Sequence, residues 1–229
     1  APKGPAAFSL NTKLTMKNYQ SYSGRGMDIA ENRADDLDRR SLAYLAEKDD
    51  PYVFELGSGS GGQAVRMVAA GACVVALDVH DFTSDYQAKR SIKNIDAARL
   101  RFISADMRHA PQLFKGISFD AIIMQRVIHY LSYQEALQLL SELRALTSGS
   151  LFISVTGLDS MVGDSYPLRD EPLESRFGKV TDLGQDMFGI TEPICLYTEV
   201  EFTSLLMEAG WQVEDCWTSA FGNHKAVCR

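Results

Sequence analysis

The stretch FELGSGSGG, residues 54–62, is a glycine-rich loop directly after an apolar run. This arrangement is typical of nucleotide-binding α/β proteins and therefore indicates the fold. The loop fits two patterns. Gly57, Gly59 and Gly62 make GxGxxG, the dinucleotide fingerprint, whereas ExGxGxG begins at Glu55. Since the two patterns imply different ligands, residues outside the loop are needed to choose between them.

Around this loop, short apolar runs rich in β-branched residues alternate with segments of helical period, which predicts an α/β protein with a largely parallel sheet. The expected strands are Tyr52–Leu56, Cys73–Val79, Leu100–Ser104, Phe119–Met124, Ser150–Thr156, Trp211–Thr218 and one near His224–Cys228. The last two follow each other without a helix, so we expect an antiparallel hairpin at the end of the sheet. Ser132 with Glu135, and Thr198 with Glu201, predict capping boxes at two helix starts.

We expect an N-terminal flap and helix at 1–50, with the helix at about Asp28–Lys48, followed by one domain at 51–229. Residues 157–197 are far longer than the roughly 2 to 6 residues of an ordinary connection, so we interpret them as an inserted lid. The lid carries eight acidic and three basic residues. That balance either favours a neutral or cationic small substrate or reflects a solvated acidic surface.

The composition bears on which partners the protein binds and on where in the cell it is expected. A net charge of −7 and no basic stripe argue against nucleic acid. No apolar run approaches the roughly 20 residues of a membrane span, and no signal peptide is recognisable, so we expect a soluble, cytoplasmic monomer or homodimer. The four cysteines form no CxxC, and buried thiols are favoured over a Cys216–Cys228 pair.

Three carboxylates at strand ends favour one ligand for the glycine loop. Glu55 would repel a pyrophosphate but suits an ammonium or sulfonium group. Asp78, about 20 residues beyond the loop, can accept from both hydroxyls of a ribose, and Asp106 can accept from an adenine amino group.

With these motifs the chain resembles the class I S-adenosylmethionine-dependent methyltransferases from about Pro51 to Arg229. FELGSGSGG looks like the family's first motif, ALDVH its second-strand acid, SADM its adenine-binding turn, and FDAIIMQRVIHYL its fourth strand and following turn. LYTEVEFTSLLMEAGWQVEDCW is similar to the helix and sixth strand before the antiparallel seventh strand. The resemblance implies a Rossmann-like three-layer sandwich with a mostly parallel seven-stranded sheet, and S-adenosylmethionine as the cofactor.

For the methionine end of that cofactor, the resemblance places Glu55 and Gly57 by the amino group and Gln125 under the methionine moiety. Gly59 and Gly61 would let the carboxylate and the ribose come close. Because Gln125 stands where metal-dependent, catechol-type members have an aspartate, no metal is expected.

For the adenosine end, the resemblance places Asp78 on the ribose hydroxyls and Val79 against the adenine. Asp106 and Met107 would contact the adenine edge. Ser58 replaces the Cys or Ala of many members and belongs to the same cofactor-binding loop.

Catalytic residues are less well indicated, because methyl transfer mainly needs positioning of the nucleophile and exclusion of water. His129 is the candidate base, since QRVIHYLS follows the fourth strand and should line the mouth of the site. A histidine that only packs locally is the alternative. Arg126 is assigned to the cofactor, although it could instead hold an anionic substrate or be solvated.

Upstream, NYQSYSGRGMD places two tyrosines and an arginine in a stretch that in similar enzymes often folds over the cofactor. Tyr22 is a second candidate catalytic residue, and Tyr19 and Arg25 are assigned to the cofactor. Gly24 and Gly26 would permit the movement. An ordinary N-terminal tail with incidental aromatics is the alternative.

The sequence thus predicts a methyltransferase acting on an O, N or C atom of a small molecule. A nicotinamide-dependent reductase is the first alternative, which Glu55, the terminal hairpin and the lack of a recognisable Tyr-x-x-x-Lys disfavour. A catalytically inactive partner subunit with the same fold is the second. A protein or RNA substrate is disfavoured by the acidity of the chain and by the size of the lid.

Overall fold

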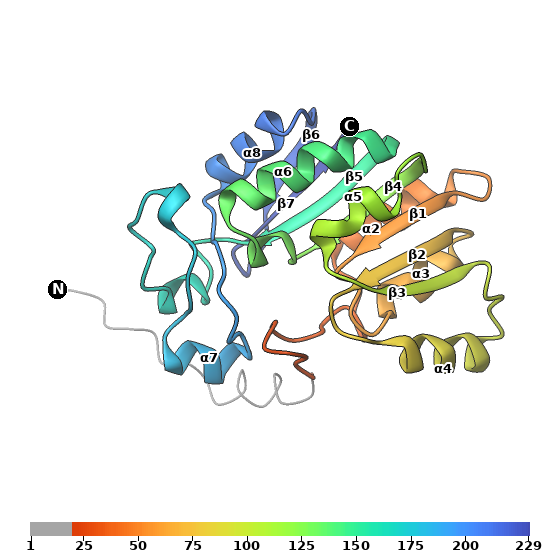
Figure 1. Cartoon of the computed structure of the whole chain (residues 1–229), viewed down its shortest axis with the longest axis horizontal. Helices are drawn as coiled ribbons and strands as arrows, with labels where there is room; N and C mark the ends of the chain where they lie inside the picture. Colours follow the sequence, from red (N-terminus) through yellow and green to blue (C-terminus); the bar gives the residue numbers. More distant parts are fainter. Residues whose placement is uncertain (1–19) are drawn as a thin grey trace.

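The computed structural model describes residues 20–229, and one seven-stranded sheet forms its centre (Figure 1). The strands are β1 (Tyr52–Leu56), β2 (Cys73–Asp78), β3 (Leu100–Ser104), β4 (Phe119–Gln125), β5 (Thr147–Thr156), β6 (Val213–Thr218) and β7 (Asn223–Cys228). Their order is β3-β2-β1-β4-β5-β7-β6, and β7 pairs antiparallel with both β5 and β6. The predicted α/β, Rossmann-like sheet with its C-terminal hairpin is therefore confirmed.

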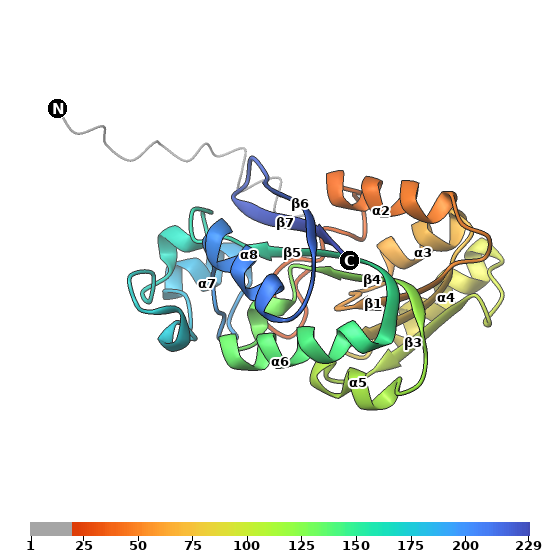
Figure 2. The ribbon, with the colours of Figure 1, turned by 90° about the horizontal axis from the view of Figure 1, so that it is seen from above.

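Helices cover both faces of this sheet. They are α2 (Asp36–Ala46), α3 (Gly62–Ala69), α4 (Thr83–Lys93), α5 (Ala110–Leu113), α6 (Tyr133–Leu143), α7 (Asp182–Phe188) and α8 (Glu199–Glu208). The first three pack on one face, and α5, α6 and α8 pack on the other (Figure 2). The helix starts at Ser132 and Thr198 both have the capping boxes that the sequence predicts.

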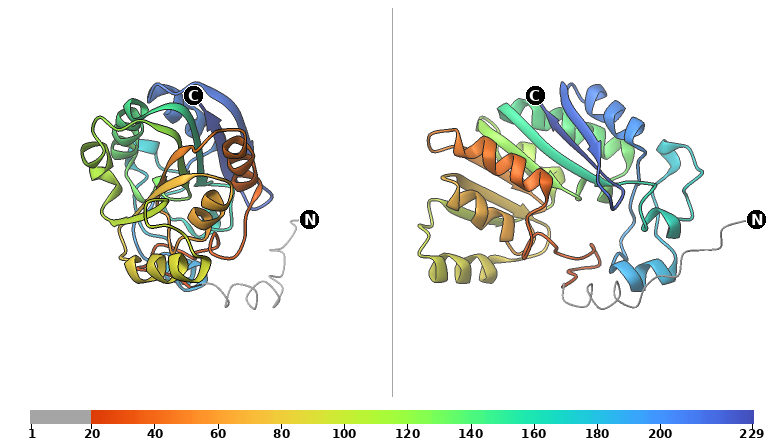
Figure 3. Two further views of the ribbon diagram at one scale, coloured as in Figure 1. Left: turned by 90° about the vertical axis from the view of Figure 1, so that its right-hand side faces the viewer. Right: turned by 180° about the vertical axis from the view of Figure 1, so that it is seen from behind.

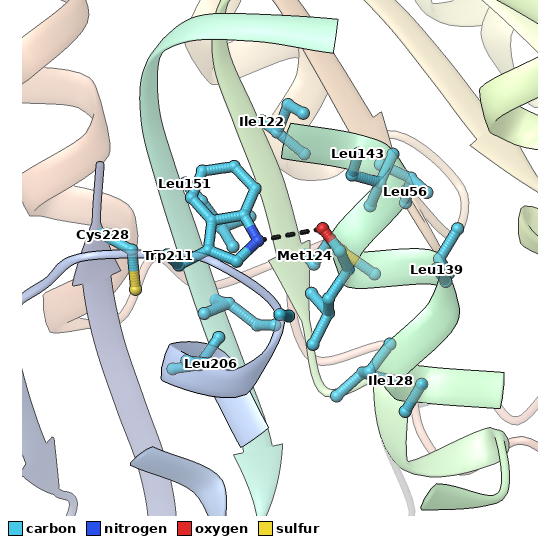
Figure 4. Packing of buried hydrophobic residues seen from close by; sticks show 14 of the residues in the cluster. Leu56, Ile122, Met124, Ile128, Leu139, Leu143, Leu151, Leu206, Trp211 and Cys228 are labelled. Carbon is cyan, nitrogen blue, oxygen red and sulfur yellow. Dashed lines mark hydrogen bonds between the residues drawn. The ribbon is translucent and has the colours of Figure 1, made fainter. Parts of the chain in front are cut away.

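The larger apolar cluster lies between the sheet and the second of these helix layers. Trp211 is 2% exposed, and its indole nitrogen donates a hydrogen bond of 3.0 Å to the carbonyl of Leu140 (Figure 4). Leu143, Leu151 and Leu206 are fully buried in the same cluster. Each such side chain contributes about 1.5–3 kcal/mol by leaving water. This packing fixes the strands whose carboxyl ends form the site.

The predicted N-terminal helix begins later than expected. It starts at Asp36 rather than near Asp28, because Asp35 and Asp38 form a capping box that fixes the first turn there. Residues 20–34, here called the N-terminal segment, instead cross the glycine loop. Asp28 accepts hydrogen bonds from the backbone and hydroxyl of Ser60, at 2.9 and 2.8 Å. Asp28, where the helix was predicted to start, instead bonds to the glycine loop, which is distant in sequence.

Residues 157–197, here called the insertion, follow β5 and lie beside the N-terminal segment (Figure 3). Their own apolar cluster includes Tyr166, Phe188 and Leu196. Three backbone hydrogen bonds join the two parts. Gly26 N–H donates to the Gly189 carbonyl at 2.9 Å, and the Gly24 carbonyl accepts from Thr191 N–H at 2.8 Å and from Glu192 N–H at 3.3 Å. The insertion therefore carries order of its own and is tied to the N-terminal segment.

Candidate active site

A cavity of about 910 Å³ opens at the carboxyl ends of the parallel strands. Its walls come from the loop after β1, the ends of β2 and β4, the N-terminal segment, the insertion and the turn after β6. This is the edge at which open α/β sheets bind ligands, and the volume is at the upper end of the ~300–1,000 Å³ of small-molecule sites.

Most residues selected from the sequence line this one cavity. They are Tyr22, Arg25, Glu55, Gly57, Ser58, Gly59, Asp78, Val79, Asp106, Met107, Gln125, Arg126 and His129. Gly61 is not among the lining residues: it has φ +98°, and a Cβ there would lie 2.7 Å from the Tyr86 ring, so it serves the turn beneath the loop. Tyr19 lies outside the described residues.

Two glycines of the loop have left-handed backbone conformations and neighbours that leave no room for a side chain. Gly57 has φ +68°, and a Cβ at this position would overlap the Val127 side chain. Gly59 has φ +54°, and its N–H donates to Oδ2 of Asp78 at 3.0 Å. Because side chains are excluded here, a ligand can approach the loop backbone closely.

Glu55 is a buried carboxyl group that lacks a partner. It is 5% exposed, and its Oε2 accepts no hydrogen bond within the described residues. Burial, followed by the nearby charge of Asp38, raises the pKa of Glu55 well above its ordinary value, while Arg66 opposes the rise. An ammonium group bound beside this carboxyl group would satisfy the oxygen and favour its charged form. A pyrophosphate would do neither.

Asp38 and Gln125 complete this acidic end of the cavity. Asp38 is 2% exposed, and Gln125 donates a side-chain hydrogen bond to its carboxylate. Burial is the largest cause of the raised pKa of Asp38. Sequence reasoning missed Asp38, because the only local signal was its place three residues after a helix cap.

The other two acidic residues differ in how far they are already engaged. Asp78 accepts from Gly59 N–H and, at 2.9 Å, from His80 N–H, and burial raises its pKa. Asp106 pairs with Arg108 at 2.6 Å, and that side chain lowers the pKa of Asp106. Both carboxylates keep free lone pairs toward the cavity that could accept from a ribose or an adenine.

The two candidate catalytic residues differ from what their types suggest. His129 is 2% exposed, and burial together with Arg126 lowers its pKa to about 3. Its Nδ1 accepts from Thr156 N–H at 3.5 Å, which favours a neutral ring with its proton on Nε2. Tyr22 donates its hydroxyl hydrogen bond to Gln20, and its ring packs 4.7 Å from Phe82. Both arrangements argue against a general base.

Residues 53–149 match the family model described as a methyltransferase domain. Over these residues the chain is similar to methyltransferase domains, in agreement with the class I S-adenosylmethionine-dependent methyltransferase that the sequence predicts. S-adenosylmethionine is the cofactor of this class, and the unpartnered Glu55 oxygen beside the open glycine loop fits its ammonium group. A search of curated proteins finds no match.

Solved structures share the fold of this methyltransferase domain. One is a 1,6-didemethyltoxoflavin-N1-methyltransferase from Burkholderia thailandensis, with 18% identity, a TM-score of 0.62, and coverage of 100% of this chain and 92% of that one. Magnesium protoporphyrin IX methyltransferase from Synechocystis has 16% identity and a TM-score of 0.60 over 83% of this chain and 80% of its own.

An O-methyltransferase family protein from B. thailandensis has 14% identity and a TM-score of 0.61 over 84% of this chain. The match covers only 56% of that longer protein. At these identities the likenesses show the fold of the methyltransferase domain. None of the described helices is long and apolar enough to cross a membrane.

Proposed function

We propose that the chain transfers a methyl group from S-adenosylmethionine to an O, N or C atom of a small molecule enclosed in the cavity. The observation that carries the proposal is the cover of the cavity. The N-terminal segment and the insertion, which are joined by backbone hydrogen bonds, both contribute to its walls together with the glycine loop. An enclosed site of this size suits a small molecule better than a polymer.

The chain's own residues have separate tasks in this reaction. Glu55 and Asp38 would hold the ammonium group of the cofactor, and Asp78 would hold its ribose hydroxyls. The N-terminal segment would exclude water through the contact of Asp28 with Ser60. The bound cofactor supplies an electrophilic methyl group for in-line displacement. Because burial lowers the pKa of His129 and its Nδ1 accepts a hydrogen bond, the acceptor atom would react as a nucleophile without help from that side chain.

A likeness with a solved complex supports a small acceptor. The structure of the 1,6-didemethyltoxoflavin-N1-methyltransferase contains bound 1,6-didemethyltoxoflavin and S-adenosylhomocysteine, and its likeness covers 100% of this chain. Because the likeness extends over the whole of this chain, it supports a small molecule as the acceptor, but it does not identify the compound.

A fractionated cell extract tests the proposal. The protein would be incubated with methyl-tritiated S-adenosylmethionine and, separately, with the metabolite, protein and RNA fractions of the extract. Label should accumulate in the metabolite fraction and depend on Asp78. Label confined to the protein or RNA fraction would refute a small acceptor. Cofactor binding without label in any fraction would support the inactive partner subunit.

A further inference from the structure

Four arginines that line the cavity make no salt bridge with a described residue: Arg25, Arg33, Arg39 and Arg126. Arg33 lies over the Phe221 ring and Arg39 donates to the Ala34 carbonyl, which leaves Arg25 and Arg126. Arg25 lies in the N-terminal segment and Arg126 follows β4, and neither makes a salt bridge with an acidic residue of the described 20–229 range. Residues 1–19 contain no Asp or Glu. By contrast, Arg108 and Lys225 in the same walls are paired with carboxylates. Arg25 donates one hydrogen bond of 3.4 Å to the Ser23 carbonyl, and neither Arg25 nor Arg126 has a carboxylate partner within the described residues.

The hydroxyl of Tyr130 lies in the same part of the cavity. Burial raises the pKa of Tyr130, the positive charges of Arg126 and Arg25 oppose that rise, and the carboxylates of Glu192 and Asp78 add to it. A Cβ at Gly26, next to Arg25, would lie 3.3 Å from Tyr130 Oη. Arg25, Arg126 and Tyr130 thus line one cavity, and the backbone next to Arg25 lies against the Tyr130 hydroxyl.

The backbone of Arg126 is held in an unusual conformation. Its φ is +54°, the left-handed region that glycine adopts far more readily than a residue with a side chain. Its N–H donates to the Ser154 carbonyl at 2.8 Å, which fixes this end of β4 against β5. A strained position with an unpaired charge is typical of a site that a ligand completes.

The position of this cluster is on the insertion side of the cavity. Tyr130 packs against the apolar cluster of the insertion, and Arg25 pairs through its backbone with Ile190. The proposed ribose and adenine contacts are at the ends of β2 and β3, and β1 and β4 lie between those strands and β5. The cluster is thus placed beyond the cofactor, where the acceptor would enter.

We propose that Arg25, Arg126 and the Tyr130 hydroxyl bind a carboxylate of the methyl acceptor. The inference rests on the proposed function and reassigns the two arginines, which the sequence analysis placed at the cofactor. Phe188 and Ile190 of the insertion line the same wall and would contact an apolar body. The acceptor class is therefore a small apolar or aromatic carboxylic acid.

The acidity of the insertion does not oppose this class. None of its eight acidic residues lines the cavity, and all but Glu192 are exposed to solvent. Asp159 and Asp164 pair with Arg169 on that outer surface. The preference for a neutral or cationic substrate, one of two interpretations of the lid composition, therefore loses its basis.

Paired acids and amides test the proposal. Protein saturated with S-adenosylhomocysteine would be titrated with 4-hydroxybenzoate, 4-hydroxybenzamide, salicylate and salicylamide, and binding would be measured by saturation-transfer NMR and calorimetry. Each acid should bind about tenfold or more tightly than its amide, as expected for charge-assisted hydrogen bonds. Arg126→Gln and Arg25→Gln should remove this preference, whereas Arg101→Gln, at an exposed position of β3 outside the cavity, should keep it.

The carboxylate of the cofactor is the other source of the same chemistry. S-adenosylmethionine and decarboxylated S-adenosylmethionine would therefore be titrated into wild type and Arg126→Gln. The proposal predicts equal affinities of the two proteins for S-adenosylmethionine. A loss for S-adenosylmethionine alone would assign the site to the cofactor and overturn the proposal, as would acids that bind no better than their amides. Wild type that fails to bind S-adenosylhomocysteine would instead refute the proposed function.

Discussion

Replacement of Glu55 by Gln should weaken cofactor binding and stabilise the ligand-free protein at the same time. Glu55 is 5% exposed with one unpartnered oxygen, and its pKa is raised by burial and by Asp38. A carboxyl group whose pKa is raised on folding lowers stability as pH rises above its unfolded value of about 4.3. Glu55→Gln removes that penalty, so the melting temperature of the ligand-free variant should be higher at pH 8 than that of wild type.

The same substitution removes the partner of the cofactor's ammonium group. Loss of a charged hydrogen bond costs about 1.5–3 kcal/mol, which corresponds to an affinity for S-adenosylhomocysteine lower by about ten- to a hundredfold. In wild type, binding must ionise Glu55, so affinity should rise with pH by up to about tenfold per unit below its raised pKa. Glu55→Gln should flatten this dependence. Calorimetry at pH 6 and 8 measures the affinity for S-adenosylhomocysteine, and thermal melts at the same pH values measure the stability of the ligand-free proteins. An affinity of Glu55→Gln equal to that of wild type, or a lower melting temperature of the variant at pH 8, would contradict the assigned role of Glu55.

Three further substitutions separate the roles of the site. His129→Gln should leave the dependence of methyl transfer on pH between 6 and 9 unchanged, because the pKa of His129 is lowered to about 3; loss of an acidic limb, in which the wild-type rate rises with pH, would contradict this. Gly57→Ala should destabilise the fold by several kcal/mol in urea unfolding, since the new Cβ would overlap Val127 at φ +68°, and a change within about 0.5 kcal/mol would count against the loop geometry. Asp28→Asn should weaken S-adenosylhomocysteine binding by about tenfold with little change in melting temperature, because its main contact is with Ser60 of the glycine loop; equal binding would show that the N-terminal segment does not cover the cofactor.

Patterns within short stretches of sequence were enough to predict most strands of the sheet. The predicted strands Tyr52–Leu56 and Leu100–Ser104 agree with the structure at both ends, because Pro51 and Gly57 bound the first run and Arg99 precedes the other. The hairpin of β6 and β7 followed from the absence of a helix between them. The capping boxes were readable because both partners lie within four residues.

Contacts between distant residues could not be predicted in the same way. The start of α2 was misplaced because the residues before it bond to Ser60, more than 30 positions away. Asp38 lies beside Glu55 and Gln125 only after the helix packs on the sheet. His129 had the right position in the chain for a base, but burial and the Thr156 hydrogen bond decide its protonation. These features depend on tertiary packing, which sequence periodicity does not encode.

Parallel calorimetric titrations with S-adenosylmethionine, S-adenosylhomocysteine and NADPH, on wild type and on Asp78→Ala, distinguish a methyltransferase from a nicotinamide-dependent reductase. Asp78 lies at the end of β2 with its carboxylate bonded to the glycine loop. The account predicts micromolar binding of the two sulfur compounds by wild type, loss of that binding in Asp78→Ala, and no binding of NADPH. Binding of NADPH alone would contradict the account and favour the reductase.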